Sequence, residues 1–242
     1  MKTRKVRYSS SKNIVKAITK ISEAITSDLY LEDILKLIVS VTAEVMGSKI
    51  CSIMLLDKAK KELIVKATQS VSERYNKKPN VKLGEGIAGE VARSGRHITI
   101  VDVKKDNRYV NREIAKRENL CSLLSVPLAY KDQIIGVLNC YTAKPHKFNE
   151  NEINILKSIA NQSAVVIENF RLVVETKVIK EELESRKVIE RAKGILMKQD
   201  NLSEEDSYGR IRKYSMDKRR GMREVSEAII ISEEMKKGEK DI

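Results

Sequence analysis

The chain has 242 residues, a charged fraction of 33% and a formal net charge of +13 at pH 7. Its length allows one or two domains, and no apolar run reaches the roughly 18 to 20 residues of a membrane span, so we expect a cytoplasmic protein without a membrane partner. The basic excess favours anionic partners. The three cysteines, Cys51, Cys121 and Cys140, are odd in number and widely spaced, which argues against a disulfide framework or zinc site and predicts buried thiols.

Residues 1–27 form a basic arm with a first helical stripe. Seven basic residues precede the first acid, Glu23, and apolar residues recur at helical spacing from Ile14 to Ile25. We interpret the arm as a solvated tail, with nonspecific RNA affinity as the alternative. A second stripe, from Leu31 to Val45, predicts another helix that ends at Gly47.

After Gly47 the apolar pattern changes to the short runs typical of strands. A glycine-rich turn, residues 82–92, leads into a short helix. The predicted strands cover residues 50–56, 62–68, 97–101, 121–130 and 133–142. Strands that follow one another as hairpins indicate an antiparallel sheet with helices beside it, which is an α+β fold.

Specific residues in this region resemble a GAF domain over residues 28–170. The segments that carry the resemblance are Cys51–Asp57, Gly84–Gly89, Ser125–Leu128, Gly136–Leu138 and Phe148–Gln162. The resemblance implies a sensor module that binds a ligand or dimerises, with any ligand held between the sheet and its covering loops and helices. We therefore expect an unidentified small-molecule signal, while no cofactor is evident from the residues.

We expect no enzyme activity from this region. GAF-like methionine sulfoxide reductases carry a reactive cysteine in the glycine turn, where this chain has Ala88. The turn also lacks the lysine and Ser/Thr of a phosphate-binding loop, which favours a structural turn. His97 and His146 are isolated, so no metal site is expected. Tyr109 and Tyr130 are interpreted as ordinary core or surface residues, with a place in a ligand pocket left open.

A long helix is predicted from Asn149, which caps it, to about Met197. Four of its residues keep the four-three-four spacing of a coiled coil: Leu172, Thr176, Ile179 and Leu183. We interpret residues 171–187 as a connecting helix that pairs with a second copy to form a homodimer. The alternative is a helix packed against its own sensor domain.

Residues 188–242 predict a small module of three helices. Ser203 is placed to cap the second helix, whose first turn is acidic. The predicted inward stripes are Val188, Ala192, Ile195 and Leu196, then Tyr208, Ile211 and Ser215, then Met222, Val225 and Ile229. Basic residues dominate from Arg210 to Arg223, and such a one-sign cluster around Tyr214 is typical of a polyanion site.

This module resembles an ANTAR domain. The residues that carry the resemblance are Ile189–Met197, Leu202–Glu205, Ile211–Asp217, Arg219–Arg220 and Glu224–Ile230. The resemblance implies a three-helix domain that binds paired hairpin loops in messenger RNA and blocks formation of transcription terminators. Three departures are Gly221-Met222, where the family usually has a basic residue and leucine, and Ser207 and Ser226, where alanine is usual.

The sequence therefore predicts a signal-responsive, RNA-binding antitermination regulator. Arg212, Lys213, Arg219 and Arg220 are predicted to hold loop phosphates, and Tyr214 to stack on a splayed base. Lys193 and Lys198 are predicted to extend this basic surface. Two alternatives stay open: a DNA-binding regulator with a helix-turn-helix, and a noncatalytic dimerising adaptor with a GAF ligand sensor.

Overall fold

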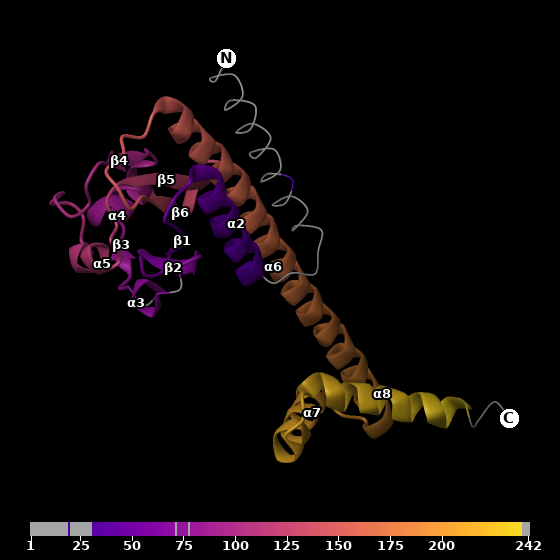
Figure 1. Ribbon diagram of the computed structural model, residues 1–242. Coiled ribbons are helices and arrows are strands. Elements are labelled where there is room, and N and C mark those ends of the chain that lie inside the picture. Colours follow the sequence, from indigo (N-terminus) through magenta and orange to yellow (C-terminus); the bar gives the residue numbers. More distant parts are fainter. Residues whose placement is uncertain (1–18, 20–30, 71, 77, 239–242) are drawn as a thin grey trace. The chain divides into compact units, whose positions relative to one another are not determined.

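The computed structural model describes residues 19, 31–70, 72–76 and 78–238 (Figure 1). The predicted basic arm and most of its helical stripe lie outside these residues. The chain divides into two compact units between Arg171 and Leu172. The first unit holds a mixed sheet-and-helix domain, and the second is helical.

The first unit is built on one six-stranded sheet in which every strand pairs antiparallel with its neighbours. The order across the sheet is β3-β2-β1-β6-β5-β4. The strands are β1 (Ile50–Asp57), β2 (Glu62–Thr68), β3 (Val81–Lys82), β4 (Ile98–Ile100), β5 (Leu123–Tyr130) and β6 (Gln133–Tyr141). The α+β class and the two main hairpins, β1-β2 and β5-β6, are confirmed.

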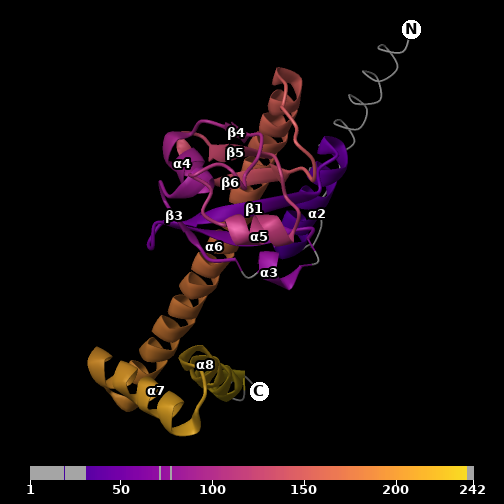
Figure 2. The ribbon, with the colours of Figure 1, turned by 60° about the vertical axis from the view of Figure 1, so that its left-hand side comes forward.

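Helices cover both faces of this sheet (Figures 1 and 2). Helix α2 (Leu31–Met46) and the first part of α6 (Glu150–Asp200) pack on one face. The other face is covered by α3 (Glu73–Asn76), α4 (Gly86–Ser94) and α5 (Arg112–Arg117). The short elements α3, α5 and β3 were not predicted from the sequence.

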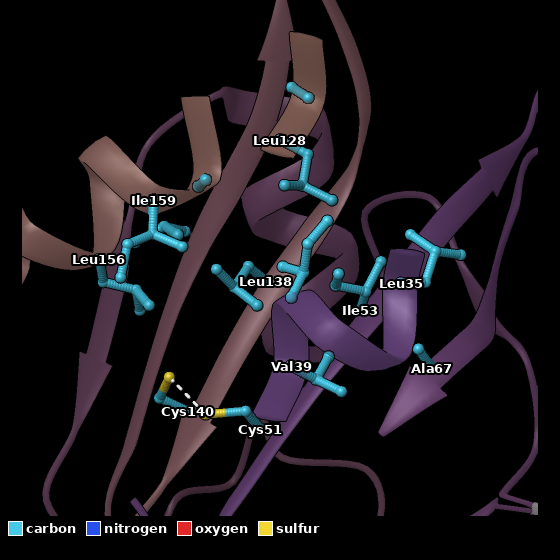
Figure 3. Packing of buried hydrophobic residues seen from close by; sticks show 14 of the residues in the cluster. Leu35, Val39, Cys51, Ile53, Ala67, Leu128, Leu138, Cys140, Leu156 and Ile159 are labelled. Atoms are coloured by element: carbon cyan, nitrogen blue, oxygen red, sulfur yellow. Dashed lines mark hydrogen bonds between the residues drawn. The ribbon is translucent and has the colours of Figure 1, made fainter. Parts of the chain in front are cut away.

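The core under α2 and α6 contains a close pair of cysteines (Figure 3). Cys51 on β1 lies directly opposite Cys140 on β6, and their sulfur atoms are 2.9 Å apart. All three cysteines are buried and unbridged, as predicted. Burial raises the pKa of the Cys51 thiol well above its ordinary value, because the thiolate would lose its hydration. The contact between two of the thiols was not foreseen.

The glycine-rich turn before α4 is a site of close backbone approach. A Cβ atom at Gly89 would lie 2.3 Å from the carbonyl oxygen of Lys82, and the Gly84 amide donates to the Gly89 carbonyl over 2.8 Å. Gly86 has a φ of +59°, and a Cβ there would lie 3.2 Å from Val110. The glycines are therefore explained by packing, in agreement with the predicted structural turn.

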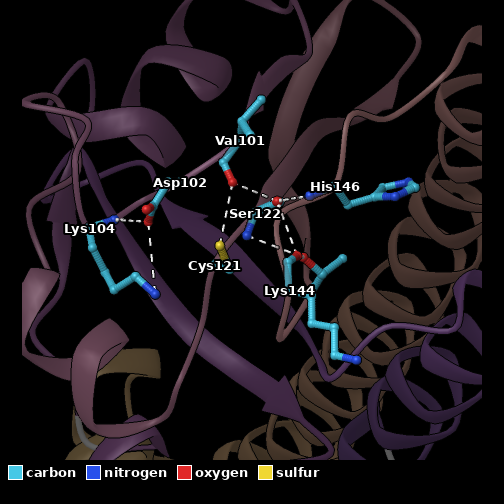
Figure 4. Close-up of polar contacts among 8 residues, drawn as sticks. Val101, Asp102, Lys104, Cys121, Ser122, Lys144 and His146 are labelled. Atoms are coloured by element: carbon cyan, nitrogen blue, oxygen red, sulfur yellow. Dashed lines mark hydrogen bonds and ion pairs between the residues drawn. The ribbon is translucent and has the colours of Figure 1, made fainter.

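A buried serine joins three segments near the end of the sheet (Figure 4). The Ser122 hydroxyl donates to the Val101 carbonyl and accepts from the His146 amide, both over 2.7 Å. The imidazole of His146 lies 2.9 Å from a carboxylate oxygen of Glu152. Among the described residues no cluster of three metal-binding side chains occurs.

Helix α6 is continuous over 51 residues, from Glu150 to Asp200. Asn149 caps it by accepting from the Glu152 amide over 3.0 Å, while the Glu152 carboxylate accepts from the Asn149 amide over 2.8 Å. The helix lacks proline, and its first glycine is Gly194. No helix within the described part of the chain is apolar and long enough to be a membrane span.

The second unit contains three helices around a small core. The end of α6 packs against α7 (Glu204–Lys218) and α8 (Met222–Gly238). The core residues are Ala192, Leu196, Ile211, Val225 and Ile230. Ser203 caps α7 by accepting from the Asp206 amide over 3.0 Å, as predicted.

The prediction that Tyr208 of α7 faces the core of the module is wrong. Tyr208 is 43% exposed, and the neighbouring Ser207 is fully buried in its place. The hydroxyls of Ser207 and Ser226 each donate to the backbone carbonyl four residues earlier, over 2.8 Å. These intrahelical bonds satisfy the polar atoms, so serine is tolerated at positions where the helices approach closely.

Candidate nucleic-acid interface and sensor cavity

Five of the seven predicted RNA-binding residues lie in the second half of α7 and in the turn that follows it, and the other two, Lys193 and Lys198, lie on α6. Arg212, Lys213 and Tyr214 are exposed on α7, and the Tyr214 ring is 54% exposed. The Lys218 ammonium lies 6.0 Å from the centre of that ring. A protruding aromatic ring beside a cation is the arrangement that stacks on an unpaired base.

Helical geometry separates these residues into two groups. Each residue advances about 100° around a helix, so Arg212 and Tyr214 point about 200° apart. Lys213 lies between them, and Lys218 lies one turn beyond Tyr214 on the same side. The structure therefore does not bring Arg212 and Tyr214 onto one face. Lys218, which was not among the predicted RNA-binding residues, lies on the same face as Tyr214.

The turn after α7 holds two arginines in a fixed backbone. Arg219 adopts the left-handed conformation, with φ of +50°, that glycine adopts most easily at a helix end. The Arg220 amide donates to the Ser215 carbonyl over 3.0 Å, and the Ser215 hydroxyl donates back to the Arg220 carbonyl over 2.5 Å. An arginine kept where glycine would be less strained suggests a role for its side chain.

The cations of this region differ in their pairing. Arg210 pairs with Asp200, Arg220 with Glu224, and Arg223 with Glu227. Within the described residues no carboxylate lies within ion-pair distance of Arg212, Lys213, Arg219 or Lys198. These four exposed cations therefore have full charge available for a polyanion.

Lys193 differs from the other predicted contacts because it is only 6% exposed. Its ammonium donates to Glu190 over 2.9 Å and to Glu204 over 2.8 Å. These hydrogen bonds, with Glu204 the larger contributor, raise the pKa of Lys193 and lower the pKa of Glu204. The prediction that Lys193 extends the exposed basic surface is wrong, since the lysine joins α6 to the start of α7.

The connecting part of α6 carries exposed apolar residues. Leu172, Ile179 and Leu183 are each more than 40% exposed, and Thr176 between them is also exposed. A groove of about 790 Å³ runs beside this part of the helix, with Tyr208 of α7 among its lining residues. These residues therefore remain available to a further surface.

The sheet domain contains a small cavity on the face covered by α4 and α5. It has a volume of about 20 Å³ and is lined by Lys78, Tyr109, Asn111, Tyr141 and other residues. Tyr109 is a buried core residue, as preferred from the sequence, and it also lines this cavity. Tyr130 packs on the opposite face, against the α2 and α6 cluster.

Lys78 is the unusual residue of this cavity because it is 8% exposed and lacks a carboxylate partner among the described residues. Its ammonium lies 3.4 Å from the Tyr75 hydroxyl and 4.5 Å from the centre of the same ring. Burial lowers the pKa of Lys78 from its ordinary value of 10.5 to about 8, because the charged form loses hydration.

This shift predicts a specific dependence of stability on pH. Because the folded pKa is lowered, the unfolded chain binds more protons between pH 8 and 10.5, so stability rises with pH across that interval. We expect the free energy of unfolding to rise by roughly 2 to 3 kcal/mol more in the wild type than in Lys78→Met. Denaturant titrations of both proteins at pH 7.5, 9 and 10.5 measure this difference. The prediction would be contradicted if the free energy of unfolding changed with pH by the same amount in the two proteins.

Sequence reasoning missed Lys78 as a candidate residue. It lies among other charged and polar residues after a four-residue helix, where no periodic pattern marks an inward side. Its ammonium contacts Tyr75, three residues earlier, and it lines one cavity with Tyr109 and Tyr141, which come from later segments of the chain. Only the folded arrangement distinguishes it from neighbouring exposed lysines.

Two family models match the chain. One describes a GAF domain and matches residues 29–168, which is more than half of the chain, and the other describes an ANTAR domain and matches residues 178–230. The predicted order of the two resemblances is confirmed.

Curated relatives match the sensor half. The methyl sulfide methyltransferase-associated sensor of Methanosarcina acetivorans is 26% identical over 164 residues, which is 66% of this chain. A phosphoenolpyruvate-dependent phosphotransferase system protein of Escherichia coli is 24% identical over 155 residues, or 64% of this chain. The chain spans only 16% and 21% of the lengths of these two relatives.

Solved structures support the same fold. The GAF domain of a phosphoenolpyruvate-protein phosphotransferase from Coxiella burnetii has a TM-score of 0.60 and 25% identity, covering 68% of this chain and 98% of that one. A free methionine-R-sulfoxide reductase from Neisseria meningitidis has a TM-score of 0.56 and 19% identity, and the match covers 66% of this chain and 91% of the reductase. The second likeness concerns the fold alone.

Proposed function

Because this chain belongs to the GAF domain family and carries an ANTAR domain behind its GAF domain, we propose that it is a signal-responsive, RNA-binding antitermination regulator. GAF and ANTAR domains are sensor and regulatory domains, and the chain is a signal-sensing regulator of the ANTAR type. The finer proposal is that it binds paired hairpin loops in nascent messages, prevents terminator formation and catalyses no reaction. The observation that carries it is the exposed Tyr214 ring beside the Lys218 ammonium.

The chemistry of this surface favours looped RNA over duplex DNA. Hairpin loops present unstacked bases that an exposed tyrosine can stack on, whereas bases in a duplex are already stacked. A DNA-binding alternative would place α8 in the major groove. That helix carries Glu224 and Glu227 in its first two turns, where they would oppose phosphates.

The proposal divides the chain into functional parts. Residues 1–27 are an arm, residues 28–170 the sensor, residues 171–187 the connecting helix and residues 188–242 the RNA-binding domain. The exposed apolar residues of the connecting helix support a homodimer, because a second copy would cover them. Each copy then contributes one module, and the dimer holds two hairpins.

A gel-shift comparison tests the RNA proposal. We expect the full chain to bind a pair of RNA hairpins from a terminator region more tightly than duplex DNA of the same sequence at equal salt. Tyr214→Ala should weaken hairpin binding by about 5-fold to 150-fold, since stacking on one base contributes ~1 to 3 kcal/mol. Tyr208→Ala is the matched control on the same helix, and its affinity should match the wild type.

Each contrary result has a separate meaning. Tighter binding to duplex DNA would favour the helix-turn-helix alternative. Absence of binding to either nucleic acid would favour the noncatalytic adaptor, in which the basic surface meets an acidic protein. Equal losses in Tyr214→Ala and Tyr208→Ala would remove Tyr214 from the interface.

A further inference from the structure

Among the residues that the structure describes, the sensor domain buries one lysine, Lys78, that has no carboxylate partner. Lys78 is 8% exposed, and its ammonium donates to the Tyr75 hydroxyl over 3.4 Å. No carboxylate among the described residues lies within 4.0 Å of its ammonium. An uncompensated buried charge is costly to a fold and is commonly retained for a functional reason. The contacts of the ammonium with the Tyr75 hydroxyl and ring leave its charge uncompensated by a carboxylate among the described residues.

The surroundings of Lys78 add neutral hydrogen-bonding groups rather than further charges. Tyr109 and Tyr141 line the same cavity, and their hydroxyls are 3.3 Å apart. The side chain of Asn111 completes the polar lining. Phenols and an amide can donate to an anion without adding charge, so the lining suits a group that carries one negative charge.

The cavity also has a route to the surface. Tyr109, Val110 and Asn111 line it on one side and on their other side line an open groove of about 530 Å³. Val110 packs close to Gly86, where a Cβ atom would lie 3.2 Å from the valine side chain. The inner cavity of about 20 Å³ holds roughly one water, so a ligand must enter by moving residues 109–111.

We propose that this cavity binds the carboxylate group of a small metabolite, with the Lys78 ammonium as its counter-ion and the body of the metabolite in the outer groove. This inference rests on the proposed sensing function and adds the chemical class of the signal. A carboxylate matches the single charge of the lysine. Its entry displaces residues 109–111, which gives the ligand a structural consequence in the domain that senses it.

The test uses thermal unfolding of the full chain with sodium acetate as the probe. Sodium chloride at equal ionic strength and inorganic phosphate are the comparison salts. We expect acetate to raise the midpoint of the sensor transition along a saturating curve, by about 2 to 5 °C at saturation. The shift should vanish in Lys78→Met and persist in Lys82→Met, which removes an exposed lysine from the adjacent strand β3.

Unliganded Lys78→Met should unfold at a higher temperature than the wild type, because an apolar chain end replaces a desolvated charge. A lower midpoint would show that the ammonium serves the fold and would overturn the proposal. A saturating shift with phosphate but not acetate would overturn the carboxylate assignment. The same shift with sodium chloride, or its loss in Lys82→Met, would reduce the effect to general charge screening and equally overturn the proposal.

Hairpin binding separates this inference from the proposed function. Lys78→Met should bind RNA as the wild type does in the absence of acetate, since the lysine belongs to the sensor unit. If the wild type failed to bind RNA while acetate still stabilised it, the regulatory proposal would fail and the ligand site would stand. If the wild type bound RNA but acetate had no effect on its stability, the ligand site would fail and the regulatory proposal would stand.

Discussion

Replacing Arg212, Lys213 and Arg219 together with alanine is expected to weaken hairpin binding about 100-fold at 0.1 M salt. These side chains are exposed and have no acidic partner among the described residues, so their charge is available for phosphates. Each phosphate contact to single-stranded RNA contributes about 0.7 to the slope of log affinity against log salt, and three contacts contribute about 2. Gel shifts at several salt concentrations measure both the affinity and the slope.

The control removes the same charge from the sensor domain. Lys58, Lys60 and Lys66 are exposed on or beside β1 and β2, and their triple alanine variant should keep the wild-type salt slope. Circular dichroism of both variants checks that the helices remain folded. An unchanged slope in the Arg212, Lys213 and Arg219 variant would contradict the proposed interface, whatever the change in net charge does to overall affinity.

Placing glutamate at Ile179 and Leu183 should separate the proposed dimer and abolish its advantage on paired hairpins. Both residues belong to the exposed apolar seam of the connecting helix, and paired copies would bring the new charges together. Linking two binding sites can raise affinity by about 10² to 10⁴. We therefore expect a loss in that range on a two-hairpin RNA and little change on a single hairpin.

Light scattering should show one chain per particle for this variant and two for the wild type. Val173→Glu with Val174→Glu is the matched control, because these exposed valines lie about 90° and 170° around the helix from the centre of the seam. A wild type that is monomeric at micromolar concentration would contradict the dimer. Equal loss of two-hairpin affinity in both double variants would assign the effect to charge rather than pairing.

Periodic patterns predicted the larger elements of the fold. The apolar runs around Lys131 gave the β5-β6 hairpin, and the uninterrupted pattern after Asn149 gave α6, because each signal extends over many residues. Elements of two to six residues, such as β3 and α5, carry no such period and were missed. The inward position of α7 was misplaced by one residue, because a tyrosine at helical spacing is typical of a core, whereas Ser207 is the buried residue and Tyr208 is exposed.

The candidate sites depend on contacts that cross between elements. The sequence predicts Lys193 to be a surface cation, yet its ammonium forms an ion pair with Glu204 from the next helix. Tyr214 and its neighbouring cations could be proposed from the sequence alone, because the signal is local: an aromatic residue within a run of cations. Lys78 could not, since the residues that line its cavity come from segments far apart in sequence.

Helix α6 belongs to two hydrophobic cores, with Leu156 and Ile159 in one and Ala192 and Leu196 in the other. Neither end can slip or rotate freely, because each is anchored by its own buried side chains. A single helix therefore takes part in the folding of both units. A proline placed between Phe170 and Val188 would interrupt this helix without removing a side chain from either core.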